Sequence, residues 1–357
     1  MLILFNKYFN SHLSFISHIS YRAILSLLTS FFISLLMGSY FIKYLQNLQK
    51  YQIIRQNGPK THLLKKDTPT MGGVFIILSI FFSTILYCNL SNLYIWYVIT
   101  ILIGYGLIGL IDDYKKIKYK NTQGLELKWK YFWLSIVAFG LIYTIYSNNS
   151  NIIPTHLIVP FYAQNSFEIN YLYIFLSYFI IVGASNAVNL TDGLDGLAIM
   201  PVVFTTCGFT LISFLSENIN SSNYLHITYV KNSGELAILC TAIIGSGLGF
   251  LWFNTYPAKI FMGDVGSLSL GGCLGTIAIL LHQELLLLIM GGIFVLETIS
   301  VILQVVSFKF RKKRIFKMAP IHHHYEIKGI LEPLIIIRFW IISFILLLIS
   351  LISLQVC

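Results

Sequence analysis

Charged side chains are scarce in this sequence. Only 11% of its 357 residues are Asp, Glu, Lys or Arg, whereas 56% are hydrophobic. A soluble globular domain carries about a quarter charged residues, and the mean hydropathy of +0.76 points the same way. The composition therefore excludes a soluble fold and predicts an all-α, polytopic integral membrane protein.

Cysteines with a useful spacing are also missing. No two of them have the separation of zinc ligands, and most lie within or at the end of apolar runs. Neither a disulfide framework nor a zinc site is indicated, and small apolar fillers in helices are expected instead. The five are Cys88, Cys207, Cys240, Cys273 and Cys357.

Two further signals are absent. The first 20 residues show no small-residue cleavage pattern before the next apolar run, so no cleavable leader is expected. No RNA- or DNA-binding motif accompanies the formal net charge of +10, so nucleic acid is not an expected partner.

What the sequence does contain is a series of apolar runs, each near the length of about 20 residues that a bilayer-spanning helix needs. They predict about ten transmembrane helices in a single domain, residues 1–357. The eighth and ninth runs are separated only by His282-Gln283-Glu284, which predicts a tight turn. The ten runs are 22–42, 71–90, 93–111, 131–147, 171–190, 196–215, 235–253, 265–283, 285–307 and 337–355.

Positive charge is distributed unevenly between the segments that join these runs. Four alternate segments, 43–70, 112–130, 254–263 and 308–338, hold 21 of the 24 lysines and arginines. The positive-inside rule places these segments in the cytoplasm and both termini in the periplasm. Most of the net charge is thus expected on the cytoplasmic face.

Asp112 and Asp113 follow the third apolar run directly, and a series of lysines follows them. A carboxylate is costly in hydrocarbon, so the pair is held either by water or by a cation. One reading is a helix that ends in solvent. The other is a site in which one acid acts as a base while its neighbour holds a metal or shifts the proton affinity of the first. The nearby lysines suit an anionic substrate.

A second polar stretch, Asn186 to Gly196, interrupts the apolar sequence with two amides, two acids and two glycines. Asp192 and Asp195 offer acceptors to a ribose, a base or a metal, and glycine allows close backbone approach. The alternative is a polar turn between helices with Asp as a cap.

Asp264 lies between Gly263 and Gly266 at the start of the eighth run. A carboxylate between two glycines is well placed to bind a hard cation such as Mg²⁺, which prefers one or two carboxylates together with phosphate and water. An N-cap role is the structural alternative.

Further polar candidates lie in the ninth run and in the last lysine-rich segment. Glu297 is either a functional acid or a hydrogen-bonding partner between helices. His322, His323 and His324 do not fit zinc well, because adjacent residues rarely all point at one ion. Imidazoles beside a basic cluster suit phosphate instead. Lys65 and Lys66 by themselves indicate topology and contact with anionic lipid.

Five blocks together resemble the signature blocks of the bacterial phospho-N-acetylmuramoyl-pentapeptide transferases, which belong to the polyprenyl-phosphate N-acetylhexosamine-1-phosphate transferases. They occur in that family's order within residues 57–340. The blocks are Pro69-Thr70-Met71-Gly72-Gly73, Asp112-Asp113-Tyr114, Asn186 to Gly196, Phe261 to Ser267 and Ala319 to Glu326.

The resemblance implies a reaction at the cytoplasmic face of the bacterial inner membrane. Undecaprenyl phosphate attacks the β-phosphate of UDP-N-acetylmuramoyl-pentapeptide, giving UMP and the first lipid intermediate of peptidoglycan, with Mg²⁺ as cofactor. Catalysis of this kind depends mainly on positioning and charge stabilisation. The resemblance is also compatible with a homodimer.

The resemblance further implies roles for individual residues. Asp112 would be the base that deprotonates or orients the lipid phosphate, Asp113 would assist, and Asp264 would ligate Mg²⁺. His322, with His323 and His324, would contact the phosphates of the sugar nucleotide. The nucleoside pocket would be lined by Asn189, Asp192 and Asp195, with Asn254, Phe261 and Gln304 near it, and the matching basic positions are Lys65, Lys116, Lys120 and Lys130.

Several alternatives stay open at this point. Asp67 stands where the family usually has glycine, so the assignment between Lys65 and Lys66 is undecided. The transfer can be a single step or pass through a phosphoryl-enzyme formed on an aspartate. A sister transferase of N-acetylglucosamine-1-phosphate, an ion-coupled transporter and a non-catalytic lipid-binding scaffold are the competing functions.

Overall fold

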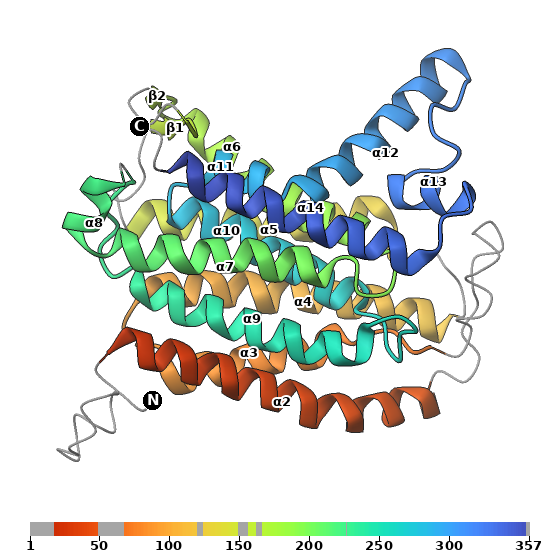
Figure 1. Ribbon diagram of the computed structural model, residues 1–357, viewed down its shortest axis with the longest axis horizontal. Coiled ribbons are helices and arrows are strands. Elements are labelled where there is room, and N and C mark those ends of the chain that lie inside the picture. The colour runs from red at the N-terminus through yellow and green to blue at the C-terminus, as the bar shows by residue number, and fades with distance from the viewer. Residues whose placement is uncertain are drawn as a thin grey trace.

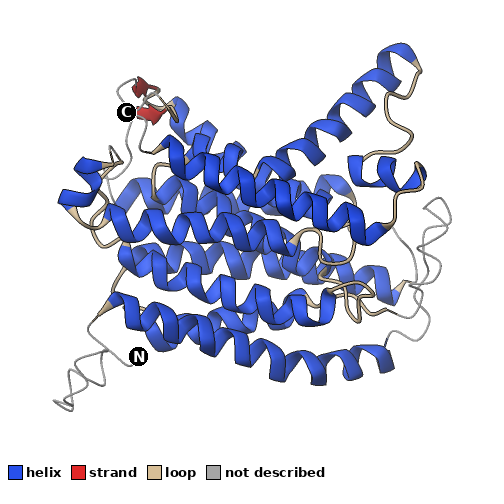
Figure 2. Ribbon diagram, in the orientation of Figure 1, coloured by secondary structure: helices blue, strands red, loops and turns tan. Residues whose placement is uncertain are grey.

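The protein is a bundle of helices with one small β-hairpin (Figures 1 and 2). A computed structural model describes residues 18–48, 68–119, 124–148, 156–161, 166–225 and 227–354. The hairpin pairs β1 with β2 in antiparallel register, Leu157 opposite Phe167. The elements are α2 (Ile19–Leu48), α3 (Gly73–Tyr87), α4 (Leu93–Lys118), α5 (Leu127–Asn148), β1 (His156–Ile158), β2 (Ser166–Glu168), α6 (Leu172–Thr191), α7 (Ile199–Ser216), α8 (Ile219–Tyr224), α9 (Gly234–Asn254), α10 (Gly263–Leu280), α11 (Glu284–Met290), α12 (Gly292–Arg311), α13 (Ile321–Ile327) and α14 (Glu332–Ser353).

The polytopic α-helical prediction is confirmed. Eight of the described helices are long and apolar enough to cross a membrane, and α3 is a shorter apolar helix. Each predicted apolar run coincides with helix, including 131–147, which forms most of α5. α2 begins and α14 ends at the same end of the bundle (Figure 1), as an even number of crossings requires. Which end faces the cytoplasm stays a prediction from the charge distribution.

Helix α10 lies at the centre and is the most buried of the eight spans. It packs most extensively against α4 and α6. Small residues permit this close approach: a Cβ at Gly271 would lie 2.5 Å from the carbonyl oxygen of Ala184 in α6. The central helix thereby carries Asp264, in its first turn, between the ends of its two neighbours.

The predicted ninth span, 285–307, is not one continuous helix. It is divided at Gly291 into α11 and α12, and Gly292 follows directly. A Gly-Gly pair is a common place for a helix to bend, because neither residue has a side chain to support the turn. After this break α12 projects away from the body of the bundle (Figure 1).

Helix α4 extends further than the apolar run predicted. The run ends at Ile111, but the helix continues to Lys118 and includes Asp112 and Asp113. Lys115 and Lys116 in the last turn oppose the negative end of the helix dipole and favour this extension. The two acids are therefore held on a rigid helix.

Candidate active site

Three acids from two helices converge at one end of the bundle. Asp112 and Asp113, near the end of α4, are each only 2% exposed, which excludes the reading that they end a helix in solvent. Asp264 comes from the first turn of α10. One carboxylate oxygen from each of the three lies within 4.8 Å of the other two. We call these three residues the aspartate cluster.

Two lysines neutralise part of this charge. The ammonium nitrogen of Lys116 lies 2.6 Å from Asp112 Oδ2, 2.9 Å from Asp264 Oδ2 and 3.3 Å from Asp113 Oδ1. The ammonium of Lys130, from α5, lies 2.6 Å from Asp264 Oδ2. Both positions were expected from the family resemblance. The lysines occupy the space between the carboxylates, where a metal cation or a phosphate would also be attracted.

Backbone amides fix the carboxylates of α4. The amide of Leu125 donates to Asp112 Oδ1 at 2.6 Å, and that of Val265 donates to Asp113 Oδ2 at 3.3 Å. Gly263 has φ +73°, and a Cβ there would overlap Asp113 Oδ2. Glycine is therefore required between the aspartate cluster and the start of α10.

Asp264 is oriented by α6. Its Oδ1 accepts a 2.7 Å hydrogen bond from Asn189 Nδ2, which also lies 2.7 Å from Ser267 Oγ. The N-cap reading of Asp264 is wrong, because the N-cap of α10 is Met262 and the Asp264 carboxylate faces Asn189 and the lysines. Asn189 holds the central acid in place, and its contact with a nucleoside stays a prediction.

Two of the signature blocks pair with each other through their backbones. Gly72 N donates to Phe261 O, Gly73 N donates to Met262 O, and Phe261 N donates to Pro69 O, at 2.8–2.9 Å. The entry to α3 is thus fastened beside the entry to α10. This pairing gives a structural reason for the polar and glycine-rich residues at both positions.

Comparison with known proteins agrees with this geometry. A family model described as glycosyl transferase family 4 matches residues 95–282, and a signature described as phospho-N-acetylmuramoyl-pentapeptide-transferase signature 1 matches residues 65–77. A phospho-N-acetylmuramoyl-pentapeptide-transferase of Buchnera aphidicola subsp. Acyrthosiphon pisum (strain Tuc7) is 77% identical over 357 residues, 100% of both chains. Proteins of the same name from strains APS and 5A have the same identity and coverage.

The chain belongs to the phospho-N-acetylmuramoyl-pentapeptide-transferase family. It is accordingly a transferase and a multi-pass protein of the bacterial inner membrane. The rival classes of transporter and non-catalytic scaffold do not agree with this membership.

Asp192 adjoins the aspartate cluster at the end of α6, where it is the C-cap residue. Burial, and then the negative charges of Asp264 and Asp113, raises the pKa of its carboxyl to about 8, although the amide of Gly263 donates to it. Asp192 is therefore largely protonated at neutral pH and can donate a hydrogen bond.

The side chains of Asp195 and Asn254 make hydrogen bonds between the turn after α6 and the segment before α10. Asp195 is 1% exposed, and its Oδ2 accepts from Ala258 N at 2.9 Å. Asn254 Oδ1 accepts from Gly196 N at 2.9 Å, and its Nδ2 donates to Ile260 O at 2.7 Å. These bonds hold the turn after α6 against the segment before α10. A contact of either residue with a nucleoside stays a prediction.

The three histidines have three different sets of partners. His322 is fully buried, with Nδ1 3.1 Å from Glu297 Oε1. His323 Nδ1 lies 2.7 Å from Glu326 Oε2, and His324 Nδ1 accepts from Lys317 N at 3.0 Å. The expectation that the three rings do not share one ion agrees with these directions. Contacts of the histidines with phosphate stay a prediction.

The remaining predicted site residues are placed as follows. Gln304 Oε1 accepts from Phe316 N at 2.9 Å and from Ile315 N at 3.1 Å, so its amide fastens the loop after α12. Its role toward a nucleoside, like that of the Phe261 side chain, stays a prediction. Lys65 and Lys120 lie outside the described residues, as does Lys66.

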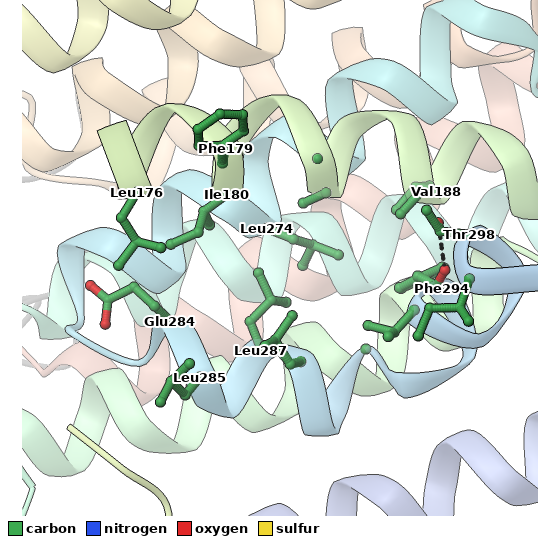
Figure 3. Close-up of a pocket in the computed structure, with 17 residues that line it drawn as sticks. Leu176, Phe179, Ile180, Val188, Leu274, Glu284, Leu285, Leu287, Phe294 and Thr298 are labelled. Carbon is green, nitrogen blue, oxygen red and sulfur yellow. Dashed lines mark hydrogen bonds between the residues drawn. The ribbon is translucent and has the colours of Figure 1, made fainter. Parts of the chain in front are cut away.

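An apolar pocket of about 350 Å³ lies between α6, α10, α11 and α12. Figure 3 shows Glu284 at one end and Val188 with Phe294 at the other. Tyr173 donates a hydrogen bond to Glu284 at the first end. Val188 immediately precedes Asn189, so the second end of the pocket adjoins the aspartate cluster.

Sequence reasoning missed several residues that shape the site. Ser267 and the amide of Leu125 contribute through contacts that no local pattern indicates. Glu332, in α14, accepts from Asp195 N at 3.0 Å. An acid at the start of the last apolar helix was the available signal for Glu332, but its partner lies 137 positions away in the chain.

Proposed function

We propose that this chain transfers phospho-N-acetylmuramoyl-pentapeptide from UDP-N-acetylmuramoyl-pentapeptide to undecaprenyl phosphate, releasing UMP and forming the first lipid intermediate of peptidoglycan. The observation that carries the proposal is the meeting of Asp112, Asp113 and Asp264 with two lysines at one end of the bundle. Family membership supports the same reaction. The acting unit in this proposal is the whole chain as a single domain.

The chemistry joins two negatively charged phosphates. An oxygen of the lipid phosphate bonds to the β-phosphorus, while the bond from that phosphorus to the oxygen shared with the α-phosphate breaks, and UMP leaves with the electron pair. Lys116 and Lys130 are placed to attract phosphate oxygens, and Asp112 to orient the acceptor or take its proton. Such transfers depend on positioning and electrostatics more than on covalent chemistry by the protein.

The aspartate cluster fits a magnesium ion. It supplies three hard carboxylate oxygens near one another, and Mg²⁺ favours oxygen ligands that include substrate phosphate. Asp264, with Asp112 and Asp113 beside it, would hold the ion, which when bound would offset charge on the β-phosphate and on departing UMP. Lys116 would have to shift, because its ammonium lies among the same three carboxylates.

The apolar pocket is the proposed location for part of the prenyl chain. Its walls are hydrocarbon over most of their length, and the end with Val188 (Figure 3) is next in the chain to Asn189, which bonds Asp264. A chain lying there would place its phosphate near the aspartate cluster. Membrane lipid would surround the rest of the polyprenyl group. The proposal also includes a homodimer, which sizing of the detergent-solubilised protein would test.

The deciding experiment measures UMP release by the purified full-length protein. We expect release that requires Mg²⁺, UDP-N-acetylmuramoyl-pentapeptide and undecaprenyl phosphate together. Turnover with UDP-N-acetylglucosamine alone as the sugar donor would instead identify the sister transferase and overturn the proposal.

We propose a single-step transfer, with no bond between the enzyme and the phosphoryl group. Radiolabelled UMP should then not exchange into UDP-N-acetylmuramoyl-pentapeptide when undecaprenyl phosphate is left out. Exchange under that condition would mean that an aspartate acts as the nucleophile.

A further inference from the structure

A buried carboxylate outside the aspartate cluster has no part in the steps above. Glu297 lies in α12 and is fully buried. Ile293, four residues earlier on the same helix, belongs to an apolar cluster with Leu194, from the turn after α6, and Ile336 of α14. A charge in such a place is stable only when it has specific partners.

The partners of Glu297 are two consecutive residues of the histidine block. Its Oε2 accepts a 2.9 Å hydrogen bond from the backbone amide of Ile321, and its Oε1 lies 3.1 Å from Nδ1 of His322. One carboxylate thus bonds the backbone at the start of α13 and lies against the ring, where Oε1 and Nδ1 are close but not aligned as a hydrogen bond. This arrangement fixes the orientation of an imidazole more firmly than a single contact would.

The opposite nitrogen of the same ring faces the turn after α6. A Cβ at Gly193 would overlap Nε2 of His322, so the ring lies directly against this glycine. Nε2 is buried and, like Nδ1 of the same ring and Oε1 of Glu297, has no hydrogen-bond partner among the described residues. A buried polar atom without a partner costs free energy, and a ligand that reached this nitrogen would relieve that cost.

The turn that His322 touches also carries Asp192. Asp192 is the C-cap residue of α6, three positions after Asn189, whose amide bonds Asp264, so this turn borders the place proposed for the substrate phosphates. A phosphate oxygen of the sugar nucleotide is therefore the group that Nε2 would meet. His322 would be the catalytic residue, and the question is what holds it.

We propose that Glu297 is the positioning residue for His322, fixing its ring so that Nε2 is presented at the Asp192–Gly193 turn. The proposal rests on the proposed function and adds to it a residue of α12, a helix that otherwise projects away from the bundle. Since Glu297 acts through His322 and does not itself reach the nucleotide, its loss should affect the transfer step more than nucleotide affinity.

The test uses the full-length enzyme and the variant Glu297→Gln, which keeps the size of the side chain but not its charge. We expect kcat for UMP release to fall about 10- to 100-fold, the range found when the carboxylate behind a metal-bound histidine is removed. KM for UDP-N-acetylmuramoyl-pentapeptide should stay within about threefold. If the wild type turns over and Glu297→Gln has the same kcat, the inference is overturned and the proposed function is left intact. A wild type without turnover would count against the proposed function itself.

A double-mutant cycle separates positioning from general support of the fold. In a His322→Ala background, Glu297→Gln should change kcat less than about twofold, because the ring that it orients is gone. An equal loss of kcat in both backgrounds would mean that Glu297 acts on the structure and not through His322, and would overturn the proposal.

Gly193→Ala tests the same contact from the other side and does not depend on the folding of a Glu297 variant. The added methyl group must displace the His322 ring, so kcat should fall by a factor similar to that of Glu297→Gln. Gly140→Ala in α5 is the matched control, since a Cβ there meets nothing within 4 Å. Full activity of Gly193→Ala would contradict the placement of His322.

Discussion

A buried ion pair and a buried acidic cluster lie at opposite ends of the bundle, and only the ion pair is balanced in charge. At the end where α2 begins, Arg22 and Glu235 form a closed pair, with NH2 2.7 Å from Oε1 and NH1 3.0 Å from Oε2. Tyr87 O accepts from the same guanidinium, and Asn89 N donates to the same carboxylate. Charge and hydrogen-bonding capacity are largely matched within the protein.

At the opposite end, the three acids of the aspartate cluster face two lysines among the described residues. The excess negative charge is retained in a place where it opposes folding. A closed ion pair joins helices, whereas an unbalanced cluster is arranged for a cation or a reacting group that arrives from outside. The two ends should therefore respond differently to the same kind of substitution.

The largest effect is expected for Asp264→Asn. It removes the acid that both lysines and Asn189 share, so UMP release should fall by about a thousandfold or more. The thermal unfolding temperature should not fall, because the substitution reduces the excess of negative charge. Glu126→Gln, at an exposed acid before α5, is the control. A melting temperature that falls together with the activity would contradict the contrast between the two ends.

A loss of about a hundredfold in kcat is expected for Lys116→Met. The same variant should bind Mg²⁺ more tightly, because it removes the ammonium that competes for three carboxylates. A titration of UMP release with Mg²⁺ measures both quantities. Lys118→Met is the matched control, since Lys118 lies on the same helix over the rings of Tyr114 and Tyr119. Weaker magnesium binding by Lys116→Met would show that the lysine assists the cation.

Arg22→Met should affect stability and leave chemistry unchanged. Breaking a buried pair leaves an uncompensated carboxylate and costs about 3–5 kcal/mol of unfolding free energy. The kcat of the protein that remains folded should stay within about twofold of the wild type. Adding Glu235→Gln to the same chain should restore part of the stability, and denaturation in detergent measures both. A specific loss of kcat would show that this end also takes part in the reaction.

The smallest effect is expected for Asp192→Asn, and it depends on pH. The pKa of this carboxyl is raised from 3.8 to about 8, so between these values the unfolded chain gives up a proton that the folded chain keeps. Asp192 therefore makes wild-type stability fall as pH rises from about 4 to about 8, with no further change above. Melting curves should show that the unfolding temperature falls less between pH 6 and pH 8.5 for the variant than for the wild type. Equal falls would mean that Asp192 is already ionised at pH 6.

Much of the fold follows from local sequence. Runs of apolar residues specify the spans because each backbone group in lipid must be satisfied within its own helix. The break at Gly291 could not be read from the hydropathy of 285–307, which stays high across it. Likewise, Asp112 belongs to a helix that outlasts its apolar run, because Lys116 and Leu125 N neutralise and bind the carboxylate.

The site was predictable to the extent that its residues stand in recognisable blocks. Lys130 and Asp264 were expected to function together, and the structure joins them at 2.6 Å. Asn189 was expected at a nucleoside, which stays a prediction, and the structure adds its bond to Asp264. The sequence left two readings of Glu297 open, and the structure adds the ring of His322 beside it. A side chain's type is visible in the sequence, but its partner is not when the two are separated by a whole helix.

The sequence alone determined that this chain lies in a membrane, which loops carry its positive charge, and which acids, lysines and histidines are candidates for chemistry. These properties depend on composition and short patterns, and on the exchange of water for lipid around each segment. Only the tertiary structure decided that Asp112, Asp113 and Asp264 share one place while Glu297 lies against His322 in another. The physical reason is that charge balance and hydrogen bonding in a buried site depend on distances between helices, and helix packing sets those distances.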